Sequence, residues 1–334
     1  MRCILISLWL AVASTFIPEC LCWMNLPTLG VRKPTSSSAS IPKNVKILIL
    51  PGFGNESGDY FLEQAPQGSL VASLQSKGWQ EDQIRVLPLK RTDWLQVFLS
   101  GALDLQFWLA DADATRPAFA WYLNRIADSI QDMTDSSDTK VILLGHSAGG
   151  WIARAALGFA SLPDSNFAKR VDLNQVMGLV TLGAPHLPPP PQVMDMTRGA
   201  LRITDQLFPG SYHQNQGIFY LTVIGNALKG VKQERKGPFE PTSPSGFAFN
   251  SYEAVCGVGD TVGDGVVPCS AGHLQDALQI NLEGIFHSIN APDNWYGSIS
   301  VIDSWHTPMM EQIAKASTAD KKSDFSATLD KLFR

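Results

Sequence analysis

The residues with the clearest chemical potential read Gly-His-Ser-Ala-Gly, at positions 145–149. A serine spaced between glycines in this way is typical of a nucleophile held on a sharp turn from a strand to a helix, where a Cβ atom in place of either glycine would clash. The flanking sequence fits that context, because an apolar run over residues 140–145 enters the turn and a helix-like run over residues 150–160 leaves it. The pattern predicts that Ser147 attacks a carbonyl carbon; a tight glycine turn without chemistry is the alternative.

A serine hydroxyl needs a base that accepts its proton and an acid that orients the base. With the nucleophile on such a turn, the acid and then the histidine follow it along the chain. Residues 257–270 offer Asp260 and Asp264, and we favour Asp264, because GDGVVP places it in a glycine-bounded turn before two strand-like valines. Capping of the turn is the alternative role for either aspartate.

Three histidines follow these acids, namely His273, His287 and His306. His287 comes directly after the last apolar run, which brings it to the edge of the sheet where the nucleophile is expected, so we predict that it is the base. His273 precedes that run, and His306 falls in the last predicted helix, where it would face away or lie at the surface. The chain order excludes His146.

Acyl transfer also needs donors for the oxyanion. One predicted donor is the N–H of Ala148, and the other comes from the loop after the first strand, LPGFGNESGDY at residues 50–60. Gly52 would let this loop approach the substrate closely, and Phe53 is the predicted second donor, with Gly54 next in order. An ordinary Pro-Gly turn is the alternative.

Strands and helices alternate from residue 45 onward. Apolar runs predict strands at residues 45–53, 83–89, 140–145, 176–185, 217–227 and 277–286. Apolar residues at helical spacing predict helices at residues 60–78, 118–133, 150–160 and 300–316, the last one bent or delayed by Pro308. This alternation predicts one α/β domain over residues 45–316, a mainly parallel sheet covered by helices on both faces. The polar tail, residues 317–334, is expected to be a surface helix or disordered.

Two stretches interrupt the alternation. The insertion at residues 187–217 carries apolar residues without strand alternation, which predicts either a lid over the site or a helix docked on the fold. The stretch at residues 229–249 is charged and rich in proline, which predicts an exposed irregular segment.

The N-terminus has the features of a targeting segment. Residues 1–13 hold a positive Arg2 and an apolar run, which predict a signal peptide, and residues 14–44 form a basic, Ser/Thr-rich leader that resembles a transit peptide. We expect entry into the secretory pathway, and then either transport to the plastid of an alga with secondary plastids or an endomembrane or secreted destination.

The composition narrows the choice of partners. The chain of 334 residues has a formal charge of −5 and a pI near 5.7, so nothing favours nucleic acid as a partner. No Cys/His spacing indicates a metal site, and no organic cofactor is implied. Cys256 and Cys269 are the two cysteines of the expected folded body, and either a disulfide or two buried free thiols fits them.

Five segments, taken in chain order, carry a family resemblance. ILPGFGNESGDY, LLGHSAGGWIAR, LVTLGAPH, GDGVVP and LEGIFHS…NWYGS resemble plant and algal α/β-hydrolases grouped with glycosylphosphatidylinositol inositol-deacylase-like and lipase-like proteins. The resemblance covers about residues 45–306. It implies the α/β-hydrolase fold, the triad Ser147, Asp264 and His287, and hydrolysis of an ester, with a lipid as one candidate. Thioester hydrolysis, acyl transfer and ligand binding without catalysis stay open, as do the acyl chain and the oligomeric state.

Overall fold

The structure is a computed structural model that describes residues 40–134, 136, 138–234 and 242–332. The predicted signal peptide, residues 1–13, and most of the predicted leader, residues 14–44, therefore lie outside the described residues. None of the helices within the described ranges combines the length and the apolar character that a membrane span requires.

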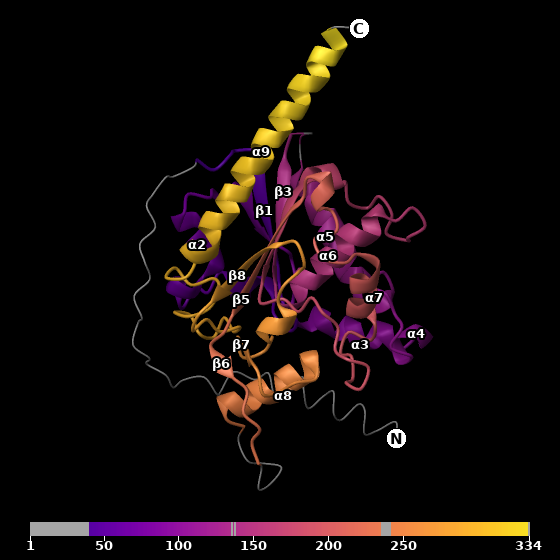
Figure 1. Ribbon diagram of the computed structural model, residues 1–334, viewed down its shortest axis with the longest axis vertical. Coiled ribbons are helices and arrows are strands. Elements are labelled where there is room, and N and C mark those ends of the chain that lie inside the picture. The colour runs from indigo at the N-terminus through magenta and orange to yellow at the C-terminus, as the bar shows by residue number, and fades with distance from the viewer. Residues whose placement is uncertain (1–39, 135, 137, 235–241, 333–334) are drawn as a thin grey trace. The chain divides into compact units, whose positions relative to one another are not determined.

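Six parallel strands form the central sheet, in the order β2-β1-β3-β4-β5-β8 (Figure 1). They are β1 Val45–Leu50, β2 Ile84–Val86, β3 Lys140–His146, β4 Val176–Leu182, β5 Phe219–Gly225 and β8 Leu278–Leu282. The strands β1, β3, β4 and β5 are almost entirely buried, because helices cover both faces and both faces of each strand are apolar. A short antiparallel pair follows, β6 Leu228–Lys229 and β7 Val262–Gly263.

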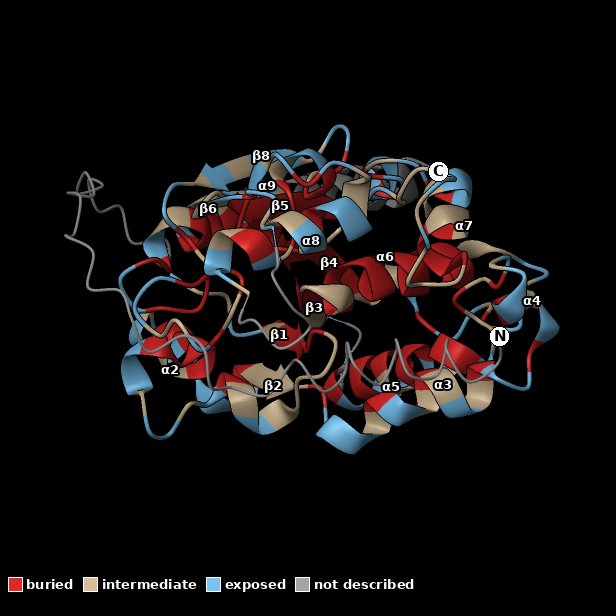
Figure 2. Cartoon of the chain, turned by 90° about the horizontal axis from the view of Figure 1, so that it is seen from below, coloured by how far each residue is buried: buried red, intermediate tan, exposed pale blue. Residues whose placement is uncertain are grey.

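Helices pack on both faces of this sheet (Figure 2). The helices of the described residues are α2 Leu70–Ser76, α3 Gln96–Gly101, α4 Leu105–Trp108, α5 Pro117–Met133, α6 Ala148–Ser161, α7 Ala200–Leu207, α8 Pro244–Cys256 and α9 Asp303–Leu332, of which α3 and α7 pack on other helices and α8 on β6. Alternate residues of one strand enter two separate cores. In β1, Leu48 packs with α5 and α6, whereas Ile47 and Ile49 pack with α2 and the first part of α9. The two-sided sheet that the alternation predicts is therefore present.

Some predicted boundaries were wrong. The stretch 229–249 contains the start of α8, because Ser243 caps that helix by accepting the N–H of Gly246, and Pro244 fits the first helical turn. The last strand is shorter than residues 277–286, since β8 is an edge strand with an exposed outer side. The helix α9 passes through Pro308 and includes most of the tail, residues 317–334.

The insertion at residues 187–217 is a helix docked on the fold. At its centre, α7 packs against α6. The guanidinium of Arg154 is buried between the two and donates to the carbonyl oxygens of Phe208 and His186 and to the carboxylate of Asp205. Displacing the insertion would leave this buried cation without its compensating partners, which is strongly destabilising, so these bonds fix the insertion in place.

Both body cysteines are free, and each is half-buried. The disulfide alternative is therefore wrong for this structure. The Sγ of Cys269 lies 3.6 Å from the carbonyl oxygen of Gly225, and burial raises the pKa of its thiol.

Candidate active site

Ser147 lies on the turn between β3 and α6. Its backbone has φ 52° and ψ −126°, a conformation that costs an L-residue about 1–3 kcal/mol and persists only where the surroundings impose it. The N–H of Ser147 donates to the carbonyl of Leu182 at 2.9 Å, which ties the turn to β4. The turn is also tightly packed, because a Cβ on Gly149 would collide with the carbonyl oxygen of Leu50. These constraints hold Ser147 half-buried at the carboxyl end of the central strand.

Asp264 and His287 form a buried pair. The Nδ1 of His287 lies 2.7 Å from Oδ2 of Asp264. The same Oδ2 accepts the hydroxyl of Tyr296 at 2.7 Å, while Oδ1 accepts the backbone N–H groups of Val266 and Val267 at 3.0 and 2.7 Å. Four donors therefore compensate for burial of a carboxylate that is only 1% exposed.

This pairing sets the state of the His287 ring. Because Nδ1–H donates a hydrogen bond to the carboxylate of Asp264, the lone pair of the neutral ring lies on Nε2, as a general base requires. The backbone N–H of His287 also donates to the carbonyl of Asp264 at 2.9 Å, so both side chain and main chain fix the orientation of the ring.

His146 connects His287 to the loop after β1. Its Nε2 lies 3.1 Å from the carbonyl oxygen of His287, which can only accept, so Nε2 carries the proton. Its Nδ1 then accepts the hydroxyl of Tyr60 at 2.9 Å, and that hydroxyl accepts the N–H of Gly52 at 3.0 Å. Burial lowers the pKa of His146 to about 3, so the ring is neutral and the direction of each bond in this chain is defined.

The same neighbours bring Ser147 and His287 to one corner of the sheet. The rings of His146 and His287 have their centroids 4.9 Å apart. Gly52 packs against both Ser147 and His146, since an added Cβ would lie 2.7 Å from the Cβ of Ser147 and 3.3 Å from Nδ1 of His146. Within the described part of the chain, Oγ of Ser147 makes no hydrogen bond, and such bonds are often loose before substrate binds. Ala148 and Phe53, the predicted oxyanion donors, are half-buried beside this corner, and their role stays a prediction.

Two alternative site residues are engaged elsewhere. Asp260 is exposed and forms an ion pair with Lys229 at 3.1 Å. His273 lies at the sheet, where Nδ1 contacts the hydroxyl of Thr222 at 2.8 Å and Nε2 contacts Oδ1 of Asn281 at 3.2 Å. Neither residue contacts Ser147.

His306 is neither a base candidate nor a surface residue. It is 7% exposed, and its Nε2 accepts the indole N–H of Trp79 at 2.9 Å. Burial lowers its pKa to about 4. Of the two expected positions for His306, the one that faces away from the nucleophile is found, and the surface position is not, because the first turns of α9 face the sheet rather than solvent.

Tyr60, His146 and Tyr296 were missed as site residues by the sequence reasoning. His146 was considered only as a base, whereas its position next to Ser147 is the signal for a supporting role. Each tyrosine stands in a segment that carries the family resemblance, but tyrosine hydroxyls give no spacing pattern that assigns them to one aspartate or one histidine.

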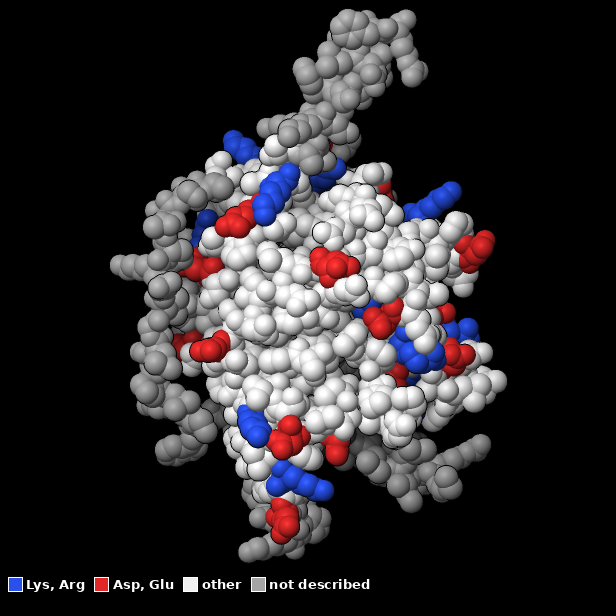
Figure 3. Space-filling model, in the orientation of Figure 1, with Lys and Arg blue, Asp and Glu red and all other residues white. Residues whose placement is uncertain are grey.

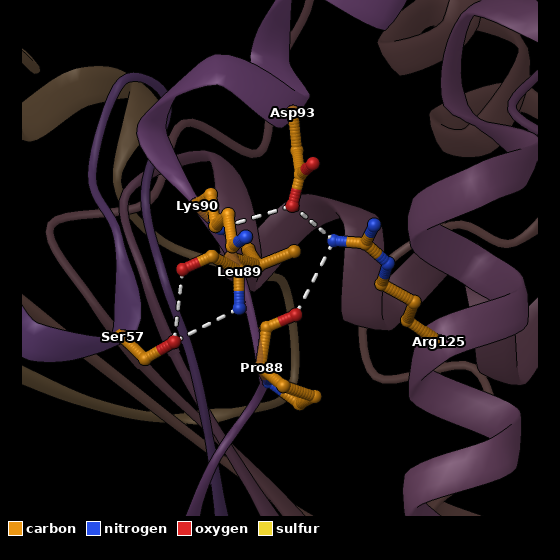
Figure 4. A pocket seen from close by; sticks show the side chains of 6 residues that line it. All are labelled: Ser57, Pro88, Leu89, Lys90, Asp93 and Arg125. Atoms are coloured by element: carbon orange, nitrogen blue, oxygen red, sulfur yellow. Dashed lines mark hydrogen bonds and ion pairs between the residues drawn. The ribbon is translucent and has the colours of Figure 1, made fainter.

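A hollow of about 400 Å³ lies beside the loop after β1 but does not include the paired residues. Figure 4 shows its lining, Ser57, Pro88, Leu89, Lys90, Asp93 and Arg125. Its polar groups are bonded to one another: Arg125 pairs with Asp93 at 2.5 Å, and the hydroxyl of Ser57 bridges both backbone groups of Leu89. The Arg125, Asp93 and Ser57 side chains are thus already engaged within the lining.

Charged side chains form small mixed groups over the face seen in Figure 3, without a continuous basic patch. Among the described residues, no three His, Cys, Asp or Glu side chains are grouped as metal ligands.

Comparisons with known proteins agree with this architecture. Residues 110–221 match the family described as PGAP1-like alpha/beta domain. The match and the sheet order confirm the predicted fold class, although nothing in the comparisons bears on a plant or algal origin. No curated protein matches the chain.

Several solved structures are similar at low identity. Staphylococcus hyicus lipase is 13% identical over 87% of this chain and 100% of that chain, with a TM-score of 0.49. The lipase BlEst2 of Bacillus licheniformis, in mature form, is 15% identical over 79% and 91%, with a TM-score of 0.45. EstA from Clostridium botulinum is 10% identical over 85% and 92%, with a TM-score of 0.44.

Proposed function

We propose that this chain, an α/β-hydrolase-fold protein with a PGAP1-like match over residues 110–221, hydrolyses a carboxylic ester through an acyl-enzyme on Ser147. One observation carries the proposal. A serine forced into a positive-φ turn lies at the same corner of the sheet as a buried His287–Asp264 pair whose free ring nitrogen is Nε2. Nucleophile, base and orienting acid are the groups that acyl transfer requires.

The proposed steps follow from these groups. Oγ of Ser147 bonds to the carbonyl carbon while its proton passes to Nε2 of His287. The carbonyl oxygen takes the electron pair of the broken π bond, and the N–H groups of Ala148 and Phe53 stabilise it. The intermediate then expels the alcohol, which takes the proton from His287. Water repeats the sequence on the acyl-enzyme and releases the acid.

His146 acts in this proposal as a positioning residue. It touches neither substrate nor reacting atoms, but its Nε2–H holds the carbonyl of His287, and Tyr60 connects its other nitrogen to the loop that carries Phe53. The base and the oxyanion loop are thereby held by one side chain, which keeps their separation fixed as charge develops.

The direct test is Ser147→Ala, assayed against a panel of soluble and lipid esters. We expect a fall in kcat/KM of roughly 10⁴-fold or more, because loss of a nucleophile removes the covalent route. Ser300→Ala, a change at an exposed serine that bonds only the carbonyl of Asp293, is the matched control and should keep full activity. Hydrolysis by Ser147→Ala at a similar rate to the unmodified protein would show that the proposed function is wrong.

A further inference from the structure

The outer face of α3, α4 and the turn between them is apolar and exposed (Figure 2). We call this face the α3–α4 surface. Its large side chains and their exposed fractions are Leu95 55%, Leu99 69%, Leu103 91%, Leu105 69%, Trp108 50% and Leu109 64%. Single exposed leucines are ordinary, but six large apolar side chains within one short segment mark an interaction site.

The α3–α4 surface carries no exposed charge of its own. Asp104 is the one charged residue between positions 94 and 110, and its side chain is turned inward. Both its oxygens accept from the guanidinium of Arg116, at 2.6 and 2.7 Å, and this contact lowers the pKa of the carboxyl. The surface therefore offers water neither charge nor a row of hydrogen-bonding groups.

Arg91 and Asp111, one near each end of the segment, are paired within the chain. Arg91 contacts Asp59 at 2.8 Å, and Asp111 contacts Arg202 at 2.7 Å. Each of these two charges is therefore balanced by an opposite charge beside the segment. The chemistry of the surface is thus that of apolar insertion, not of electrostatic attraction.

The segment is apolar on its inner side as well. Trp94, Val97 and Phe107 are buried, and α3 packs against α5. The guanidinium of Arg198 lies 5.5 Å from the centre of the Phe107 ring, which ties α4 to the segment before α7. The outward leucines therefore stand on a segment whose inner side is held by packing, and folding alone does not require these leucines to be apolar.

The buried inner side of this segment also contacts the loop beside the candidate active site. The rings of Trp94 and Phe53 have their centroids 5.0 Å apart, and the indole N–H of Trp94 donates to the carbonyl of Asn55 at 2.9 Å. Phe53 and Asn55 belong to the loop after β1, whose Gly52 lies beside Ser147. The buried side of the segment that carries the α3–α4 surface is thus in contact with the loop that flanks the nucleophile.

We propose that the α3–α4 surface docks on a lipid surface, with its leucines and Trp108 inserted among the acyl chains. An uncharged apolar face gains free energy there by leaving water, and tryptophan is suited to the boundary between headgroups and chains. Docking would bring the loop after β1 to the lipid, so that an ester in that surface is delivered to Ser147. The delivery step rests on the proposed function, whereas the docking does not.

The test is flotation of the full chain with phosphatidylcholine vesicles, using Ser147→Ala so that no lipid is consumed. We expect binding that does not rise with added anionic lipid and does not fall in 0.5 M salt, because screening acts on charges and not on apolar insertion. The double variant Leu103→Glu/Leu105→Glu should lower the vesicle partition coefficient at least about tenfold, since it removes two of the most exposed apolar side chains.

The matched control is Val258→Glu/Ile299→Glu, which changes two exposed apolar residues outside the surface, at 55% and 50%. It should bind vesicles as well as the parent of these variants, Ser147→Ala, and circular dichroism should show all variants folded. Equal binding by the two double variants, binding only to anionic vesicles, or no binding by the parent would overturn the proposal. Self-association that Leu103→Glu/Leu105→Glu abolishes, without vesicle binding by the parent, would assign the surface to a second copy of the chain.

Discussion

Two neighbouring regions of this molecule depart from the usual pattern of apolar residues inside and polar residues outside. One buries polar side chains, and the other exposes apolar ones. Behind Ser147, Asp264, His146 and Tyr296 are buried polar residues in a part of the fold that could have been filled with apolar ones. Near this site, the α3–α4 surface exposes leucines at positions where charged side chains would not lower the stability of the fold.

The two regions differ in whether their side chains have partners within the protein. Every oxygen of Asp264 and both ring nitrogens of His146 have a hydrogen-bond partner inside the protein, so the buried network is complete. The leucines of α3 and α4 have no partner among the described residues. Because buried polar groups and exposed apolar patches are both costly, each region is expected to be retained for function, the first for chemistry and the second for contact.

The largest expected effect concerns the base. His287→Ala should lower kcat by roughly 10⁴-fold or more, about as much as Ser147→Ala, because triad members act as a unit. His273→Ala should keep most of the activity, since its ring is bonded to Thr222 and Asn281. The check is the initial rate with a soluble p-nitrophenyl ester, and loss of activity in His273→Ala alone would move the site to a different part of the sheet.

The acid comes next. Asp264→Asn should lower kcat by roughly 10³–10⁴-fold, because an amide cannot both accept from the imidazole N–H and balance its positive charge. Asp260→Asn is the matched change, and it should alter kcat less than about twofold, since an exposed ion pair contributes little. Equal losses in the two variants would mean that the buried pair has no special role.

A smaller effect tests the positioning residue. Tyr60→Phe removes two hydrogen bonds, one from the N–H of Gly52 and one to His146. We expect about a tenfold fall in kcat with KM nearly unchanged, which is the size of effect that a hydrogen bond contributes. Tyr122→Phe is the control, because its buried hydroxyl bonds the carbonyl of Pro51 but not the histidines. Both variants should lose stability, and an equal change in kcat would reduce Tyr60 and His146 to structural residues.

The smallest effect is on stability rather than turnover. His146 and His306 stay neutral in the fold because burial lowers their pKa to about 3 and about 4, whereas the unfolded chain takes up protons near pH 6.5. The unfolded state therefore binds more protons below pH 6.5, and stability falls as the pH falls through this window. Each of these histidines should lower the free energy of unfolding by about 2 kcal/mol when the pH falls from 6.5 to 5, as measured by urea denaturation.

The matched variant for this window is His306→Gln, whose amide oxygen can still accept from Trp79. It should unfold with a visibly weaker pH dependence than the parent. An unchanged slope would show that His306 is not held neutral in the fold.

The predictable parts of the chain were those buried on both sides. The strands β1, β3, β4 and β5 appear in the sequence as continuous apolar runs, and the turn at Ser147 follows from its glycines. The choice of Asp264 over Asp260 and of His287 over two other histidines came from chain order and local turn chemistry. The structure places that aspartate and that histidine in contact.

What the sequence did not predict depends on long-range neighbours. No period distinguishes α3 and α4, because residues on both of their sides are apolar. The bonds of Tyr60 to His146 and of Tyr296 to Asp264 join residues 86 and 32 positions apart, and only the fold brings them together. The edge strand β8 lacks the apolar outer face that would have fixed its length.

Covalent labelling by a fluorophosphonate probe, with the modified peptide identified by mass spectrometry, shows directly whether Ser147 is the nucleophile. We expect one adduct, on Oγ of Ser147, formed by the unmodified protein and by Leu103→Glu/Leu105→Glu and greatly slowed in His287→Ala. Labelling of a different serine, or none in a folded parent, would contradict it.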